Sequence, residues 1–365
     1  MQIKDLTNYL ESIAPSNYQE SYDNSGLIVG DYNQTINKAL VSLDCTEAIV
    51  DEAIATGCDI IISHHPIVFK GLKRFNGSNY VERVVMKAIA NNIALYAIHT
   101  NLDSVSTGVN AKICEKIGLT NCKTLAPKSG ILKKLCFFVP LTATEVVKNA
   151  IFNAGAGQIG NYSNCSFSVK GEGTFKANEK ANPFVGQKNE IHTEAEQRVE
   201  VVYPAQAESQ IIKALLNAHP YEEVAYDIYS LDNQHQDVGA GMVGELTEEM
   251  DALDFLRHLK QSMELSVIRH TEILPKKIKR VAVCGGSGSF LLKNAIRANA
   301  DVFVTADFKY HEFFDAEDKL IIADIGHFES EQFTQQLLLD IITEKFPNFA
   351  IRLTGNNTNP IKYLS

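Results

Sequence analysis

Residues 59–66 read Asp-Ile-Ile-Ile-Ser-His-His-Pro, and this stretch decides the fold class. The continuous apolar run at 60–62 is typical of a parallel strand that is buried on both faces. His64 and His65 follow directly, at the point where the strand ends. In open α/β sheets, ligands bind beyond the carboxyl ends of the strands. The stretch therefore predicts a parallel sheet with a functional site at this edge.

Strands and helices alternate on both sides of this run. In the first third, strand patterns occur at 26–30, 38–44 and 93–98, and helical spacing occurs at 3–13, 47–55, 80–90 and 108–117. In the last third, strand patterns occur at 279–284, 301–305 and 320–323, and helical patterns occur at 251–260, 290–298 and 329–345. Such alternation predicts two α/β lobes whose sheets are mainly parallel.

The middle third has a different order. Strand patterns lie at 133–139, 165–170, 198–203 and 224–229, and helical patterns lie at 142–153 and 207–217. This βαββαβ order is that of a ferredoxin-like unit, and the polar stretch 171–193 is expected to be a long loop or a β-ribbon. We therefore predict a two-lobed α/β protein, residues 1–127 and 235–365, interrupted by an inserted ferredoxin-like α+β domain at 128–234.

Composition excludes some classes of function. The chain has 365 residues and a formal net charge of −10, which argues against a broad basic surface for nucleic acid. The seven cysteines show no metal-finger spacing, so reduced thiols are expected. No apolar run approaches the roughly 20 residues that cross a bilayer. These features favour a cytoplasmic protein without a membrane partner.

The adjacent pair His64 and His65 indicates metal binding. Successive residues of a strand point to opposite faces, so the two imidazoles are poorly placed to share one ion. Two neighbouring ions are the easier arrangement at a strand end. The alternative is a turn in which one histidine is buried and the other is exposed.

Two more segments with metal-binding side chains follow strand patterns. The strand at 93–98 leads into His99 and Asp103, and either Asp103 is a ligand or it caps the next turn. His99 is a candidate ligand, partner of a ligand, or proton carrier. His327 and Glu331 follow the strand at 320–323 and are four residues apart, so they share one face of a helix. The alternative is an acidic first turn that complements the helix dipole.

These five side chains, His64, His65, Asp103, His327 and Glu331, form an all-nitrogen-and-oxygen ligand set. Such a set suits two divalent ions of Zn, Fe, Mn or Co. A carboxylate such as Glu331 could bridge the ions and help to activate a water molecule.

Two further elements are candidates for substrate contacts. Residues 285–289 read Gly-Gly-Ser-Gly-Ser between a strand and a helix, so backbone N–H groups at Gly286 and Ser287 are candidates for binding a small anion such as phosphate. The alternative is a tight turn, because the stretch matches no known phosphate-binding fingerprint. His311 lies four residues after Asp307 and is a candidate proton carrier or a structural histidine.

Taken together, these segments resemble the Nif-three-like family, whose members are labelled GTP cyclohydrolase I type 2 homologues. The matching stretches are ESIAPSNYQESYDNSGLIVG (11–30), SHHPIVFKGLK (63–73), HTNLDS (99–104), GGSGS (285–289), VTADFKYHE (304–312) and DIGHFESE (324–331). The middle domain is similar to the CutA/PII-like insert of long bacterial members, above all at HPYEEVAYDIY (219–229). Tyr22 and Ala306 depart from the family's usual Trp and Gly.

The resemblance implies a dinuclear site held by the five side chains above and a homohexamer built as a trimer of dimers. Three functions follow as hypotheses. The first is a metal-dependent hydrolase that acts on a nucleotide or phosphoester. The second is a metal-responsive regulator or metal-handling protein without turnover. The third is a structural role, in which metal ions join the two lobes.

Overall fold

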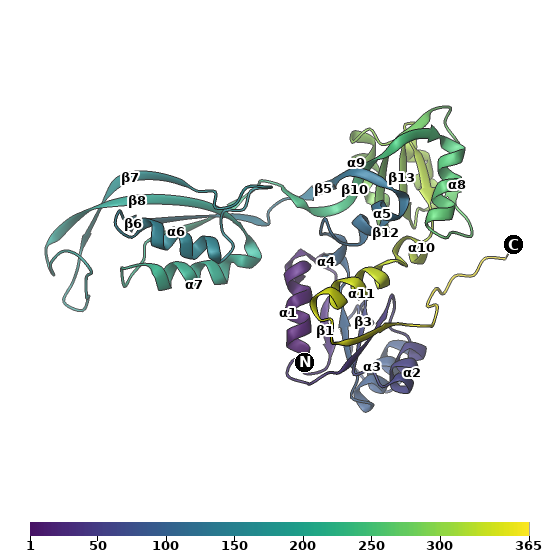
Figure 1. Cartoon of the computed structure of the whole chain (residues 1–365), viewed down its shortest axis with the longest axis horizontal. Helices are drawn as coiled ribbons and strands as arrows, with labels where there is room; N and C mark the ends of the chain where they lie inside the picture. The colour runs from purple at the N-terminus through teal and green to yellow at the C-terminus, as the bar shows by residue number, and fades with distance from the viewer. Residues whose placement is uncertain (365) are drawn as a thin grey trace. The chain divides into compact units, whose positions relative to one another are not determined.

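The computed structural model describes residues 1–364, and Figure 1 shows the course of the chain. The chain divides into two units, one formed by residues 1–126 together with residues from 237 onward, and one formed by residues 127–236. Among residues 1–364, no helix combines the length and the apolar character needed to cross a membrane.

The first unit contains two sheets. The first sheet has the order β1-β4-β3-β2-β15, in which β1 is antiparallel to β4 and all other neighbours are parallel. Its strands are β1 (Gly26–Val29), β2 (Lys38–Ser42), β3 (Ile60–Ser63), β4 (Ala94–Ala97) and β15 (Ala350–Leu353). The three isoleucines of β3 are fully buried, as the continuous apolar run predicts for a central parallel strand.

Helices cover both faces of the first sheet. The helices α2 (Glu47–Thr56) and α3 (Tyr80–Ala90) pack on the face that carries Leu40, Ile61 and Leu95. The helices α1 (Ile3–Ile13) and α11 (Thr334–Lys345) lie on the other side, where the Tyr96 hydroxyl meets Glu11 of α1. A sheet that is covered on both faces explains why its strands lack polar alternation.

The second sheet has the order β11-β14-β13-β12-β10-β5. Its strands are β5 (Leu119–Lys128), β10 (His235–Asp251), β11 (Arg269–His270), β12 (Lys277–Ser287), β13 (Val302–Ala306) and β14 (Ile321–Asp324). The strands β12, β13 and β14 are parallel, whereas β10 is antiparallel to β12 and β11 is antiparallel to β14. Its helices are α5 (Val109–Ile117), α8 (Ala252–Ser262) and α9 (Leu292–Arg297); α5 and α8 contact β12, and α9 packs on the face of Phe303.

The outer parts of the chain each give a strand to the other part's sheet. The strand β15, near the C-terminus, pairs with β2 of the first sheet, and β5, from the first third, joins β10 in the second sheet. Neither strand appears among the patterns that predict the two lobes. This exchange explains why the two outer parts form one unit rather than two.

The predicted helix at 329–345 is two helices, α10 (His327–Glu331) and α11. The interruption is slight, because Gln332 and Phe333 keep nearly helical backbone angles. A short helix, α4 (Thr100–Asp103), follows β4. The remaining helical turns are of the 3-10 type: η1 (Ser16–Tyr18), η2 (Ala205–Ala207), η3 (Ser289–Leu291) and η4 (Tyr310–Ala316).

The second unit has the element order β6-α6-β7-β8-α7-β9. The elements are β6 (Leu132–Pro140), α6 (Thr144–Asn153), β7 (Phe167–Lys176), β8 (Ile191–Pro204), α7 (Glu208–Ala218) and β9 (Tyr226–Leu231). They form an antiparallel sheet in the order β7-β8-β6-β9, with both helices packed on the face of Leu135, Phe137 and Val199. The polar stretch expected as a loop or ribbon is mainly a loop, at 177–190, and its two ends belong to the paired strands β7 and β8.

Candidate metal centre

Three strand ends of the first unit bring the predicted ligands together. His64 and His65 directly follow β3, and α4 with Asp103 follows the neighbouring strand β4. Because Ser63 and Ala97 are partners in parallel strands, both segments leave the sheet at the same edge. In the second sheet, α10 follows β14 and carries His327 and Glu331. The sequence predicts that segments following the carboxyl ends of strands meet at one place, and this geometry agrees with that prediction.

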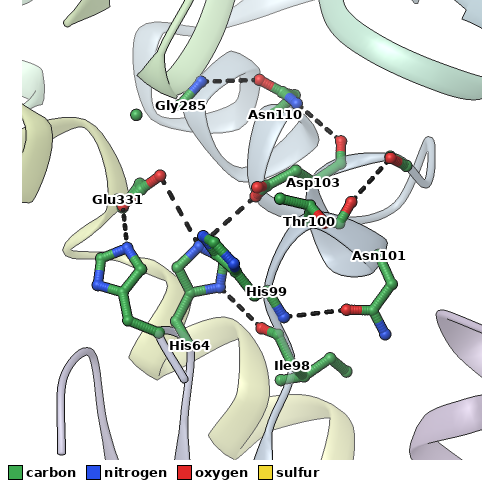
Figure 2. A network of polar contacts seen from close by, with 12 residues as sticks. His64, Ile98, His99, Thr100, Asn101, Asp103, Asn110, Gly285 and Glu331 are labelled. Carbon is green, nitrogen blue, oxygen red and sulfur yellow. Dashed lines mark hydrogen bonds and ion pairs between the residues drawn. The ribbon is translucent and has the colours of Figure 1, made fainter. Parts of the chain in front are cut away.

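Glu331 lies at the centre of the cluster, and its two oxygens face different partners (Figure 2). Its Oε2 is 3.0 Å from His65 Nε2 and 3.2 Å from His327 Nε2. Its Oε1 is 3.7 Å from His64 Nε2, which is itself 3.6 Å from Asp103 Oδ1. Two groups that could each hold a metal ion, His65–His327–Glu331 and His64–Asp103–Glu331, therefore share one carboxylate.

The Nδ1 atoms of the histidines are held on the outer side of the cluster. His64 Nδ1 lies 2.8 Å from the Ile98 carbonyl oxygen. The other three Nδ1 atoms meet carboxylates at 2.7–2.8 Å, in the pairs His65–Asp44, His99–Asp23 and His327–Asp307. Since a carbonyl or carboxylate oxygen accepts, each Nδ1 donates its proton, and Nε2 is the nitrogen that remains for the other members of the cluster.

Asp23 and Asp44 are functional residues that the sequence reasoning missed. Asp44 lies just beyond the carboxyl end of β2, the strand next to β3, so the rule that identified His64 applies equally to it. Asp23 lies outside any strand or helix, and no spacing in the sequence relates it to His99. The sequence relates Asp307 to His311, four residues later, whereas in the structure Asp307 bonds His327.

Two buried polar atoms of the cluster have no hydrogen-bond partner among residues 1–364. They are His64 Nε2 and Asp103 Oδ1, and the 3.6 Å between them is too long for a hydrogen bond. Burying such atoms without a partner costs roughly 1–3 kcal/mol each. A divalent cation between them would satisfy both, because a neutral imidazole nitrogen and a carboxylate oxygen are metal ligands. The side chains therefore fit a metal ion.

The charges of the cluster shift the pKa values of its members. Burial opposes ionisation of His65, but its bonds to Asp44 and Glu331 outweigh burial and raise its pKa to about 10. Burial and the nearby Glu331 carboxylate raise the pKa of Asp103 well above its usual value. Burial also opposes ionisation of Glu331, yet the surrounding histidines hold its pKa well below the usual value. In the absence of metal, protons therefore balance the carboxylate charge.

Asn110, at the start of α5, joins the segments from the two sheets. Its side-chain amide donates to the Asp103 carbonyl at 2.9 Å, and its Oδ1 accepts from the Gly285 N–H at 3.0 Å. Asn110 is almost fully buried, so these bonds are shielded from water. The residue ties the short helix α4, which carries Asp103, to the glycine-rich end of β12.

The glycine-rich turn lies beside Glu331. Gly286 has a φ of +60°, and a Cβ there would overlap Glu331 Oε1. The Gly286 N–H donates to Ser330 Oγ, so together with the Gly285 bond two N–H groups of this turn already have protein partners. Ser287 is exposed at the end of β12. The anion-binding role expected for Gly286 and Ser287 stays a prediction.

The two candidate proton carriers lie in different surroundings. His99 forms a third metal-capable group with His64 and His65, and the ring centroids of His64 and His99 are 5.2 Å apart. His311 is exposed on η4, where its ring contacts Tyr310 and Phe314. Within residues 1–364, His311 belongs to none of the three metal-capable groups.

Comparisons with known proteins agree with this architecture. The sequence model described as Duf34/NIF3 (NGG1p interacting factor 3) matches residues 1–360. Two relatives named GTP cyclohydrolase 1 type 2 homolog are similar along their whole length. The one from Halalkalibacterium halodurans is 36% identical, with 97% of this chain and 96% of the relative covered. The one from Bacillus subtilis is 37% identical, with 98% of each covered.

Solved structures with similar chains lead to the same group. A Bacillus cereus protein related to NIF3 has a TM-score of 0.86 and 38% identity, with 100% of this chain and 99% of that chain covered. A Staphylococcus aureus protein has a TM-score of 0.79 and 29% identity over the same shares.

Proposed function

Because this chain belongs to the DUF34/NIF3 family, we propose that its histidine–carboxylate cluster binds two divalent metal ions and serves a hydrolase. One ion would be held by His64, Asp103 and Glu331, and the other by His65, His327 and Glu331. The observation that carries this proposal is the division of Glu331, whose Oε1 and Oε2 face separate sets of ligands. A single ion would leave one of these sets unused.

The surrounding carboxylates would orient the ligands before any substrate arrives. Asp44 and Asp307 accept the Nδ1 protons of His65 and His327, which directs both Nε2 atoms at Glu331. Two bound divalent ions would supply a hydroxide near neutral pH and polarise the centre that is hydrolysed. The substrate class that suits this chemistry is a nucleotide or phosphoester, a small anion.

His99 is the side chain best placed to move a proton beside the cluster. Burial opposes ionisation of Asp23, but its bonds to His99 and Thr100 hold its pKa well below the usual value. Asp23 therefore stays an acceptor for the Nδ1 proton of His99, which leaves Nε2 to accept or donate. We propose His311 as the other candidate proton carrier, and Gly286 and Ser287 as the residues that contact the substrate.

A metal-responsive regulator is the alternative function. It is favoured by one observation: all five ligands lie in the first unit, so the second unit is available for a separate task. We propose that this unit is a ferredoxin-like domain inserted at about residues 128–234, because its antiparallel order β7-β8-β6-β9 suits that fold. We also propose a cytoplasmic homohexamer, a trimer of dimers, which light scattering of the purified protein tests directly.

Metal stoichiometry tests the two-ion proposal. Chelated protein is reloaded separately with Zn, Fe(II), Mn or Co, and the ions per chain are counted by elemental analysis. We expect two ions in the wild type, one in Asp103→Asn and one in His327→Ala. His311→Ala is the matched control and should retain both. A single ion in the wild type, or two in each ligand variant, would refute the dinuclear assignment.

Turnover is tested separately, with a panel of nucleotides and phosphoesters on metal-loaded protein. We expect hydrolysis that is lost in His65→Ala and in Glu331→Gln. If the rate of hydrolysis is unchanged in both variants, the reaction is not catalysed at this site. If metal binds reversibly with the expected stoichiometry and no substrate turns over, the regulator is the better description.

A further inference from the structure

The second unit contains a cavity that is separate from the metal centre. It has a volume of about 730 Å³ and lies on the face of the sheet opposite α6 and α7. Its wall includes Phe138, whereas the neighbouring Phe137 points into the helix-covered core. The size is within the roughly 300–1,000 Å³ that is typical of small-molecule sites.

Glycines in β7 make the hollow. Gly171 pairs with Glu196 of β8, and a Cβ added at Gly171 would meet only open space. Two residues further along, a Cβ at Gly173 would overlap the Glu196 carboxylate, which lies over this glycine. The missing side chains thus leave room both for a ligand and for the Glu196 carboxylate.

Aromatic rings line one side of the cavity. Tyr221 lies between Phe175 and Phe184, with ring centroids 6.2 Å apart in both pairs. Phe184 belongs to the loop between β7 and β8, and this loop is anchored where the Asn182 N–H donates to Glu222 Oε1 at 2.7 Å. The Tyr221 hydroxyl is buried, and burial together with the hydrogen bond to the Glu196 carboxylate raises the pKa of Tyr221.

The unbalanced charge in the cavity is negative. Glu200 is paired with Arg198 at 2.8 Å, and the other charged lining residues are the cation Lys170 and the carboxylates Glu172, Glu196, Glu222 and Glu223. Glu196 forms no ion pair with any lysine, arginine or histidine among residues 1–364. A carboxylate without a cation, beside three aromatic rings, is the chemistry that recognises organic cations.

We propose that this cavity binds an organic cation, whose charge faces Glu196 and whose apolar body packs against Phe175, Phe184 and Tyr221. The Tyr221 hydroxyl, which interacts with Glu196, would hold that carboxylate toward the ligand. All lining residues belong to the second unit, so the site acts independently of the metal ions. It gives the insert a ligand-binding role that the hydrolase proposal does not require.

Benzyltrimethylammonium is a suitable probe, because it joins a quaternary ammonium to a ring. Binding to the full-length protein is measured by isothermal titration calorimetry, with phenylacetate as the anionic comparison. We expect the cation to bind and phenylacetate not to bind. Glu196→Gln should lower the affinity for the cation at least about fivefold, because the substitution removes the negative charge that faces it.

Two further variants distinguish loss of the site from loss of the fold. Gly171→Leu should abolish binding by filling the cavity, without backbone strain, because Gly171 does not have a positive φ. Glu145→Gln, which removes an exposed charge from α6 on the other face, should leave the affinity unchanged.

Equal affinity for the cation and phenylacetate would overturn the proposal, as would unchanged binding in Glu196→Gln. Sedimentation velocity tests the other explanation, that the cavity is a contact between protein chains, by measuring the oligomeric state of each variant. If Glu196→Gln or Gly171→Leu instead changes the oligomeric state and no probe binds, the hollow is a contact between protein chains and the small-cation assignment is wrong.

Discussion

Replacing Asn110 by alanine should loosen the connection between the two sheets at the metal centre. The substitution removes bonds of 2.9 and 3.0 Å and leaves the Asp103 carbonyl and the Gly285 N–H without their partner. A net hydrogen bond contributes about 1 kcal/mol, and an unsatisfied buried group costs roughly 1–3 kcal/mol. For two bonds we expect Asn110→Ala to lower the free energy of unfolding by about 2–4 kcal/mol. That loss corresponds to a fall in melting temperature of roughly 4–16 °C for a unit of this size.

The assay is thermal and urea unfolding of the metal-free protein, followed by circular dichroism. Asn91→Ala is the matched control, because Asn91 is exposed and donates one side-chain bond, to the Lys87 carbonyl. Its effect should stay within about 0.5 kcal/mol. In the metal-loaded protein, Asn110→Ala should lower the affinity for the ion that Asp103 binds more than the affinity for the other ion. A loss of stability no larger than that of the control would refute the reasoning.

Three other results are expected. Asp44→Ala should reduce metal affinity roughly 10- to 100-fold in a chelator competition, because His65 loses its Nδ1 acceptor. Gly286→Ala should cost roughly 1–2 kcal/mol through its left-handed backbone, and it should displace Glu331, so that elemental analysis finds fewer ions per chain. Burial opposes ionisation of Glu52, yet bonds from the segment after β15 lower its pKa below the ordinary 4.5. Wild type should therefore be more stable than Glu52→Gln at pH 7, and urea midpoints should converge as the pH falls below that value.

The parts of the fold that could be predicted from sequence are those that leave a local pattern. The buried run of β3 predicts a parallel strand because its residues need no solvent-facing side. The same logic located His64, Asp103 and His327, since each follows a strand whose carboxyl end lies at the site. These positions can be predicted from the rule for strand ends alone, without knowing which strands are neighbours.

The remainder depends on contacts between residues far apart in sequence. The partner of β15 is β2, more than 300 residues earlier. No feature of either sequence indicates that the two strands pair. For the same reason the role of Asp23 was not visible, because its partner His99 is 76 residues away. The division of Glu331 between two sets of ligands likewise appears only when both sheets are assembled.

The pairing of β15 with β2 imposes an order on biosynthesis. Synthesis from Ser42 to Leu353 takes about 15–60 s at the usual rates of roughly 5–20 residues/s. During that time β2 presents an open edge to its surroundings, and the second unit emerges complete before the edge is filled. On a polysome, the last strand of a neighbouring nascent chain has the sequence needed to fill that edge. We therefore expect slow translation near the 3′ end of the message to favour strand-swapped assemblies.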